Sequence, residues 1–292
     1  MSISAAIQKS RPSLSPSSVK TYTSILSSLH RKCFGGDVEL KDFHDTGKVL
    51  EFLKSKPAAS RKTILAALVV LTSNEKFRIA MSHDITTYNE EIAKQVASPA
   101  QKAAEISPDE IRAIYEKLVS DTSQLWAKKH QTVSDLLALQ DTVILALLGG
   151  MFIAPRRSLD FCAMKVKNVD KEAGNYIEKT NLVFNSYKTS KTYGRQEVPI
   201  PKELAAILKR WIKLDPSDFL LFDSRFQPLT SVKLNQRLNR IFGGRRISIN
   251  ALRHSYLTSK FTAYSKEQRE VARTMTEMGS SPAVLNSYVK LS

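Results

Sequence analysis

An apolar segment from Asp135 to Leu148 constrains the fold of this 292-residue chain more than any other feature. It reads Asp-Leu-Leu-Ala-Leu-Gln-Asp-Thr-Val-Ile-Leu-Ala-Leu-Leu, so a helix formed here would be apolar on nearly every face. Such a helix must be covered on several sides, which predicts that it lies at the centre of a packed domain. No apolar run in the sequence reaches the about 18 residues that a membrane-spanning helix needs, so we expect no membrane span.

Helical periodicity governs the first third of the chain. After a loose segment, residues 1–10, helices are expected near 16–31, 46–54, 58–71 and 74–97. Ser15 is a good N-cap for the first of these helices, and Pro16 suits the position that follows. The stretch Asp84-Ile-Thr-Thr could interrupt the last of them. Residues 1–98 therefore predict a small all-helical domain.

A polar segment, residues 99–106, predicts a linker to a second domain, residues 107–292. Ser107-Pro108-Asp109-Glu110 is a capping box that starts this domain, and further helices are expected at 108–126, 132–149, 202–213, 231–242, 249–263, 265–277 and 282–288. Helical spacing places Tyr256 and Phe261 in the core. Strand-forming residues at 181–187 and 196–200 flank a polar tract, which predicts a hairpin. The predicted fold class is mainly α with a small antiparallel β-sheet.

The chain is strongly basic, with a net charge of +16 and a pI near 9.8. Between Arg225 and Arg273 there are eleven Lys and Arg residues against two acids, Glu267 and Glu270. A solvated surface normally mixes charges more evenly, so this excess favours a polyanion partner, with nucleic acid ahead of a membrane surface. A basic protein without such a partner is the alternative interpretation.

Cysteine usage and the N-terminus place further limits on the class of protein. The two cysteines, Cys33 and Cys162, fit a reducing, intracellular compartment, and no Cys/His cluster has the spacing of zinc ligands. The first residues lack the charged-then-apolar layout of a signal peptide. We therefore expect neither a disulfide framework nor a metal centre.

Four side chains could together break a DNA strand without a metal ion or ATP. A protein nucleophile would keep the bond energy in a covalent link, and two guanidiniums would bind the phosphate oxygens in a planar fork. A further group would donate a proton to the departing 5′ oxygen. Two arginines, a lysine and a tyrosine meet these requirements, and the chain offers arginines at Arg156-Arg157 and Arg253 and a late Tyr288. Each of them also has a structural interpretation, the arginines as plain phosphate contacts and the lysine as an ordinary hairpin residue.

The order and spacing of these residues resemble the tyrosine recombinases, the family of the phage-type integrases. The family's first box has an arginine three residues before an acid, which Arg157-Ser-Leu-Asp160 matches, with Arg156 as the rival assignment. The family's lysine lies in a hairpin with a Lys-Thr pattern followed by an arginine and Val-Pro. Here Lys188-Thr189, Arg195 and Val198-Pro199 fit, and Lys188 is preferred to Lys191.

The second arginine box and the tyrosine box follow later in the chain. Asn250-Ala-Leu-Arg253-His254-Ser-Tyr matches the family's His-x-x-Arg-His pattern except at its first residue. Gly279-Ser280 precedes Tyr288 at the family's spacing, but a histidine or tryptophan is expected where Ser280 stands. Both departures replace strong donors with weaker ones. Because the other matched positions are intact, we expect an active enzyme that is slow or tightly regulated.

The resemblance also implies an architecture, a mechanism and partners. A helical core-binding domain and a catalytic domain would clamp double-stranded DNA, and four protomers would exchange strands between two DNA sites without metal or cofactor. Tyr288 would attack the phosphate, Lys188 would protonate the leaving oxygen, and the remaining catalytic positions would stabilise the transition state: Arg157, Asn250, Arg253 and Ser280. Further contacts to DNA are expected from Arg156, Lys191, Arg195, Arg245, Arg246 and His254.

The sequence leaves two other functions possible and does not establish the source of the protein. A type IB topoisomerase shares the chemistry, although the helical first domain favours a recombinase. A catalytically silent DNA-binding protein could keep the same fold, and the departures at Asn250 and Ser280 support it. Many family members continue into a tail helix that packs on a neighbouring protomer, and here only four residues follow Tyr288. With these two departures, the sequence resembles integrases of eukaryotic viruses and mobile elements more than bacterial integrases.

Overall fold

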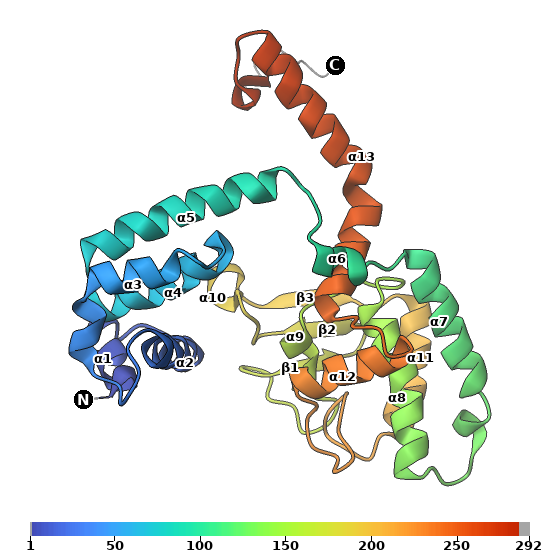
Figure 1. The fold of residues 1–292 in the computed structure, drawn as a ribbon. Coiled ribbons are helices and arrows are strands. Elements are labelled where there is room, and N and C mark those ends of the chain that lie inside the picture. The colour runs from blue at the N-terminus through green and yellow to red at the C-terminus, as the bar shows by residue number, and fades with distance from the viewer. Residues whose placement is uncertain (1, 286–292) are drawn as a thin grey trace. The chain divides into compact units, whose positions relative to one another are not determined.

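The structure is a computed structural model that describes residues 2–285 (Figure 1). The chain divides into two compact units, Met1–Ala97 and Ser98–Ser292. Helices dominate both units, and the described residues form one three-stranded antiparallel sheet in the second unit, so the predicted fold class is confirmed. No helix in the described part of the chain is long and apolar enough to cross a membrane.

The first unit is a helical assembly around its own apolar core, which includes Ile7, Leu26, Phe43 and Phe77. Its elements are α1 (Ile3–Ser10), α2 (Pro16–Cys33), η1 (Leu40–His44), α3 (Thr46–Leu53), α4 (Ala58–Thr72) and α5 (Glu75–Ala93). The predicted cap of α2 is confirmed, because the Ser15 side chain accepts a hydrogen bond from the Ser18 amide. The loose segment expected at residues 1–10 is wrong: Ser2 caps α1, which buries Ile3 and Ile7.

Helix α5 runs through Asp84, where the sequence suggested an interruption. The Asp84 side chain is 3% exposed and accepts hydrogen bonds from Arg61 of α4, at 2.9 Å from Nε to Oδ2. The same guanidinium donates to the backbone oxygen of Lys56. A carboxylate held by a facing guanidinium does not compete with the helical backbone for its own hydrogen bonds, so α5 continues.

The second unit contains the sheet and the remaining helices. They are α6 (Pro99–Ala103), α7 (Pro108–Asp121), η2 (Leu125–Ala127), α8 (Val133–Leu148), α9 (Ser158–Cys162), β1 (Asn175–Glu178), β2 (Asn181–Phe184), α10 (Ser190–Tyr193), β3 (Gln196–Pro199), α11 (Lys202–Leu214), α12 (Ser231–Ile241), α13 (Ile249–Glu277) and η3 (Pro282–Val284). Residues 99–106, which the sequence suggests as a linker, include α6. The predicted helix at 282–288 is described as far as Leu285.

Helix α8 is the centre of the second unit, as its sequence predicts. Its residues from Leu139 to Leu148 are all buried. The polar residues on it have internal partners. Gln140 is fully buried and pairs with the backbone of Phe222, donating to the carbonyl at 2.9 Å and accepting from the amide at 2.7 Å. Trp211 of α11 stacks on the Phe222 ring, so α8, α11 and the segment around Phe222 share one core.

A buried ion pair joins α8 to α12. Arg237 donates from Nε to Asp141 Oδ1 at 2.7 Å, and both side chains are 10% exposed. Arg240 donates to the second carboxylate oxygen at 2.8 Å. We expect Asp141→Ala to lower the free energy of unfolding by about 3–5 kcal/mol, because it leaves the Arg237 charge buried without its counter-ion. Urea denaturation followed by circular dichroism would measure this loss.

A matched control for this prediction is the exposed pair between Lys117 and Asp121, whose side chains are 71% and 54% exposed. Water and salt screen such a pair, so Asp121→Ala should change the free energy of unfolding by at most about 0.5 kcal/mol. Equal losses in Asp141→Ala and Asp121→Ala would show that the buried pair adds nothing beyond a surface pair.

The sheet has the order β1-β2-β3, and the predicted hairpin corresponds to β2 and β3. In that pairing Leu182 lies opposite Val198 and Phe184 opposite Gln196. The first strand, β1, was not predicted as a separate element, and it pairs with β2 through Tyr176 opposite Val183. Its four residues are too few for a clear alternating pattern, so the strand is defined by its partner.

One continuous helix, α13, replaces the two helices predicted at 249–263 and 265–277. The junction Ala263-Tyr264-Ser265 contains neither glycine nor proline, so nothing stops the backbone hydrogen-bond ladder there. Figure 1 shows the second half of α13 extending away from the rest of its unit. Phe261, predicted as a core residue, is accordingly 43% exposed.

Asp215, which caps α11, makes the stability of this unit depend on pH. Its side chain is buried, Oδ1 accepts the Ser217 amide at 2.7 Å, and Oδ2 has no hydrogen-bond partner among the described residues. Burial raises the pKa of Asp215 to about 7 from 3.8. The folded state therefore holds the proton more tightly than the unfolded state, and stability falls as pH rises from about 4 to above 7.

We expect Asp215→Asn to stabilise the protein at pH 8 and to lose this advantage at pH 4. A shift of this size corresponds to at most about 4 kcal/mol at about 1.4 kcal/mol per unit, and screening by water reduces the expected gain to roughly 2 kcal/mol. Urea unfolding of both proteins at the two pH values would measure the difference. A variant that is less stable than the wild type at pH 8 contradicts the assignment.

Candidate functional site

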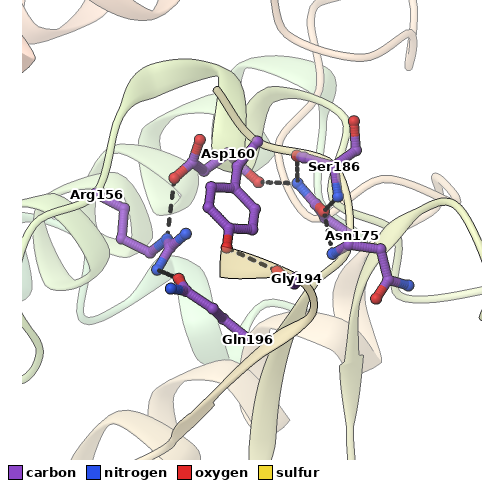
Figure 2. Close-up of polar contacts among 8 residues, drawn as sticks. Arg156, Asp160, Asn175, Ser186, Gly194 and Gln196 are labelled. Carbon is purple, nitrogen blue, oxygen red and sulfur yellow. Dashed lines mark hydrogen bonds and ion pairs between the residues drawn. The ribbon is translucent and has the colours of Figure 1, made fainter. Parts of the chain in front are cut away.

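Arg156 is held by the protein itself. Its Nε donates to Asp160 Oδ2 at 2.9 Å and its Nη1 donates to Gln196 Oε1 at 2.9 Å. The guanidinium also lies 3.9 Å from the ring centroid of Phe184 and 5.1 Å from that of Tyr187. Figure 2 shows Arg156 between Asp160 and Gln196. These contacts use the guanidinium to join the turn before α9 to strand β3.

The next residue, Arg157, differs from its neighbour. It is the N-cap residue of α9 and is partly buried. Its guanidinium makes no hydrogen bond or ion pair with any residue from 2 to 285, although its neighbour Arg156 is bound to Asp160. A partly desolvated cation without a counter-ion is energetically unfavourable, so this position is suited to receive an anion from outside.

A buried asparagine fixes the base of the hairpin next to this turn. Asn175 of β1 donates to the backbone oxygens of Asp160 and Ser186, at 2.9 and 2.8 Å. Its Oδ1 accepts the backbone amides of Asn185 and Ser186, at 3.0 and 2.8 Å. One amide side chain thus satisfies four backbone groups and ties α9 to the hairpin, as Figure 2 shows.

The tip of the hairpin, residues 187–195, carries the candidate lysines. The Tyr187 hydroxyl donates to the backbone oxygen of Gly194 at 2.7 Å and closes the loop. Gly194 has φ +65° and ψ −160°, a backbone conformation open to glycine, where the chain leaves α10. Lys188 and Lys191 are exposed, and neither pairs with a residue in the described part of the chain. The loop therefore presents two uncompensated cations on an ordered backbone.

The first turns of α13 carry the second arginine box. Ser248 caps the helix by accepting the Ala251 amide, while Ile249 and Leu252 point into the core. Arg253 is partly buried, and its guanidinium has no hydrogen bond or ion pair within residues 2–285. Asn250 and His254 are exposed on the same part of the helix. Arg253 therefore resembles Arg157: both are partly buried, and neither guanidinium has a partner among residues 2–285.

A close contact sets the position of this helix. A Cβ at Gly150 would lie 2.8 Å from Cδ2 of Tyr256, and Gly150 has φ +79°. A larger residue would therefore clash with the Tyr256 ring and would also be strained in its backbone. The Gly149-Gly150 pair that ends α8 thus allows α13 to approach.

Helix α12 connects the elements that carry the two arginines. The Ser231 hydroxyl lies 3.1 Å from that of Ser158, the residue after Arg157. One turn further along α12, Asn235 Oδ1 accepts a hydrogen bond from the amide of Ile249 at 3.4 Å. Ile249 is the first residue of α13 and lies four residues before Arg253. Four residues of helix rise by about 6 Å, so the Arg157 turn and the start of α13 lie near neighbouring positions on α12.

Two other predicted DNA contacts are engaged within the protein. Arg195 donates to Glu197 Oε1 at 2.8 Å from Nη2. Arg245 forms an ion pair with Glu110 and donates to the backbone oxygen of Glu105 at 2.7 Å. Arg246 is exposed, without an ion pair to the residues that the structure describes. Release of the exposed pairs costs little, so these cations remain available to phosphate at a small energetic cost.

Ser280 is not brought to the arginines. Helix α13 continues from Arg253 to Glu277, which at about 1.5 Å per residue corresponds to about 36 Å. Beyond it the Ser280 amide donates to the backbone oxygen of Met275 at 2.7 Å, so the chain turns back along the end of the helix. Tyr288 lies outside the described residues.

Sequence reasoning missed the side chains that position the site. Asn175 and Gln196 have no motif of their own, and only the bonds they make identify them. Asp160 was identified because the family's first box has an acid three residues after its arginine. Its role as the partner of Arg156 was not predicted. Cys162, predicted to be a buried small residue, is 5% exposed, and burial raises the pKa of its thiol to about 11. It is therefore a protonated thiol at neutral pH.

No protein-family model matches the sequence, and no curated protein matches it. Solved structures resemble the chain at low identity. Lambda integrase bound to DNA is 15% identical, with 91% of this chain and 89% of that chain covered and a TM-score of 0.49. A lambda integrase tetramer bound to a Holliday junction is 15% identical, with coverages of 88% and 72% and a TM-score of 0.46.

A second recombinase resembles the chain over a similar length. The XerH site-specific recombinase bound to its difH substrate is 16% identical, with 89% of this chain and 85% of that chain covered and a TM-score of 0.40. None of these comparisons supports a eukaryotic source. The structure of this chain is thus similar, over about nine-tenths of its length, to structures of lambda integrase and XerH.

Proposed function

We propose that this chain is a site-specific DNA recombinase that breaks and rejoins duplex DNA through a 3′-phosphotyrosyl intermediate. Its substrate is double-stranded DNA, and the resemblance to the tyrosine recombinases implies a homotetramer on two DNA sites. The net charge of +16 supports a polyanion substrate. The proposed catalytic residues are Arg157, Lys188, Asn250, Arg253, Ser280 and Tyr288.

The main support for this proposal is that the two arginines of the motifs are partly buried and unpaired. Arg157 and Arg253 are both partly buried, and neither guanidinium has a partner within residues 2–285. By contrast Arg156, Arg237 and Arg245 are bound to carboxylates of the protein. A folded chain normally pairs partly buried cations, so two unpaired ones near a common helix favour a phosphate ligand. This difference favours Arg157 over its rival Arg156.

The proposed reaction distributes its steps over few side chains. The Tyr288 oxygen attacks phosphorus and its proton passes to water. The bond from phosphorus to the 5′ oxygen breaks, and Lys188 supplies the proton to that oxygen. Arg157 and Arg253 neutralise charge on the phosphate oxygens in the transition state, where fixed donors are most effective. Asn250 adds a neutral donor. The reverse attack by a 5′ hydroxyl of the partner duplex completes strand exchange.

The length of α13 adds a geometric requirement to this mechanism. Because Ser280 follows a helix that extends about 36 Å beyond Arg253, it reaches the same phosphate only if α13 bends or if a second copy supplies it. A bend would have to interrupt the backbone hydrogen bonds of α13 between Arg253 and Glu277, because no glycine or proline weakens them there. Assembly on DNA would provide the second copy.

Covalent trapping tests the proposed function without knowledge of the target site. Wild-type protein would be incubated with a library of nicked duplexes that have a randomised core, so that cleavage beside a nick releases a short fragment and blocks rejoining. We expect a denaturation-resistant protein–DNA adduct, with mass spectrometry locating the nucleotide on Tyr288. If the protein binds the library but no adduct forms, strand breakage is excluded.

A catalytically silent DNA-binding protein is the second candidate. The separation of Ser280 from Arg253 along α13 favours it, as do the weaker donors at Asn250 and Ser280. This candidate predicts duplex binding that depends on Arg157 and Arg253 without any covalent product. A type IB topoisomerase would form the adduct but relax supercoiled plasmid as a monomer, which a relaxation assay at low protein concentration detects.

A further inference from the structure

The hairpin tip carries an aromatic side chain that the proposed mechanism does not use. Tyr193, the last residue of α10, is 66% exposed. Its hydroxyl makes no hydrogen bond with a residue of the described chain. A single exposed aromatic residue is common on protein surfaces. This one, however, lies on the same loop as two exposed and unpaired cations, Lys188 and Lys191.

The backbone that carries Tyr193 is ordered by its own hydrogen bonds. The Tyr193 amide donates to the Thr189 carbonyl at 3.1 Å, and the Gly194 amide donates to that of Ser190 at 2.8 Å. Below the tip, Tyr187 closes the loop and Asn175 fixes its base. Little conformational entropy would therefore be lost when the Tyr193 ring meets a ligand.

We infer that Tyr193 contacts the bases of duplex DNA beside the phosphate that is cleaved. The inference rests on the proposed function, which assigns Lys188 to the leaving oxygen of that phosphate. Four residues lie between Lys188 and Tyr193, and the short helix α10 (Ser190–Tyr193) folds them into a compact loop, so Tyr193 lies near the phosphate that Lys188 serves. Cations on the loop hold the backbone, and an aromatic ring is the side chain that packs against bases or wedges between them.

Duplex DNA and heparin distinguish a base contact from a charge contact. Both are polyanions, but heparin has no bases. In a Tyr288→Phe background, in which cleavage plays no part, Tyr193→Ala should weaken binding to a 30-bp duplex by about fivefold or more. Its affinity for heparin should not change. The slope of log Kd against log salt should also stay the same, because no charge is lost.

Three matched variants complete the test. Tyr193→Phe keeps the ring and should bind the duplex like the parent. Lys191→Ala should weaken binding to both polyanions and reduce the salt slope by about one. Tyr264→Ala removes an aromatic side chain that is 55% exposed on α13, and it should change neither affinity. Thermal unfolding of each variant would confirm that the fold is intact.

Two results would overturn the inference. One is a Tyr193→Ala protein that binds the duplex as tightly as its parent, and the other is an equal loss of affinity for duplex and heparin. Failure of the proposed function has a different signature, since it is the absence of a covalent adduct with wild-type protein. The binding measurements do not depend on that adduct, so the two failures are separable.

Discussion

Replacing Tyr288 by phenylalanine should abolish the covalent protein–DNA adduct and leave the affinity for duplex DNA unchanged. The substitution removes one oxygen atom, which is the proposed nucleophile, and preserves the ring. Binding relies on cations that contact phosphate, so the loss of a neutral hydroxyl should alter the dissociation constant by less than about twofold. The adduct would be measured on denaturing gels with the nicked library, and the affinity by fluorescence anisotropy.

Tyr115→Phe is the matched control, because it also removes a single phenolic oxygen and the Tyr115 ring packs against Phe152 at the core of the second unit. This variant should form the adduct at the wild-type rate. An adduct that persists in Tyr288→Phe would mean that another residue attacks, and Tyr256 and Tyr264 of α13 would then be the first to replace. Loss of DNA binding in Tyr288→Phe would assign the residue to recognition.

A mixture of two inactive variants tells whether α13 bends within one chain or whether a second copy supplies the residues after it. Tyr288→Phe would be mixed with Arg157→Ala, so that one chain keeps only the arginine and the other keeps only the tyrosine. Recovery of adduct on the Arg157→Ala chain means that the tyrosine acts at the arginines of a second copy. Absence of recovery, with an active wild type, means that α13 bends within one chain.

Replacing Arg157 by alanine should lower the rate of adduct formation by about a hundred- to a thousandfold, the usual effect of removing one electrostatic donor from such a site. The free energy of unfolding should change by less than about 0.5 kcal/mol, because the Arg157 guanidinium has no partner within residues 2–285. Single-turnover trapping on the nicked library would measure the rate, and urea denaturation the stability.

Arg156→Ala should produce the opposite pattern. It leaves the Asp160 carboxylate, which is 3% exposed, without its ion pair, and it removes the contact with Gln196. We expect a loss of about 3 kcal/mol in the free energy of unfolding, and a smaller effect on the rate than Arg157→Ala when both are compared as folded protein. A rate loss confined to Arg156→Ala would exchange the two assignments.

Local patterns in the sequence predicted most elements of the fold. The cap at Ser15, the buried helix α8 and the hairpin of β2 and β3 depend on neighbours within a turn or a strand, so the periodicity of the chain reveals them. The errors lie where an element depends on distant partners. Helix α1 forms because Ile3 and Ile7 are buried in the core of their unit, and α5 continues because Arg61 holds Asp84.

The sequence by itself determined the basic character of the chain, its mainly helical class, and the order of arginine, lysine, arginine and tyrosine. Only the tertiary structure showed that Arg156 is bound within the protein, because one of its two partners, Gln196, lies 40 residues away. It also made α13 one helix and gave Asn175 its role. Adjacent residues share a local pattern, whereas ion pairs and buried hydrogen bonds depend on which distant segments pack together.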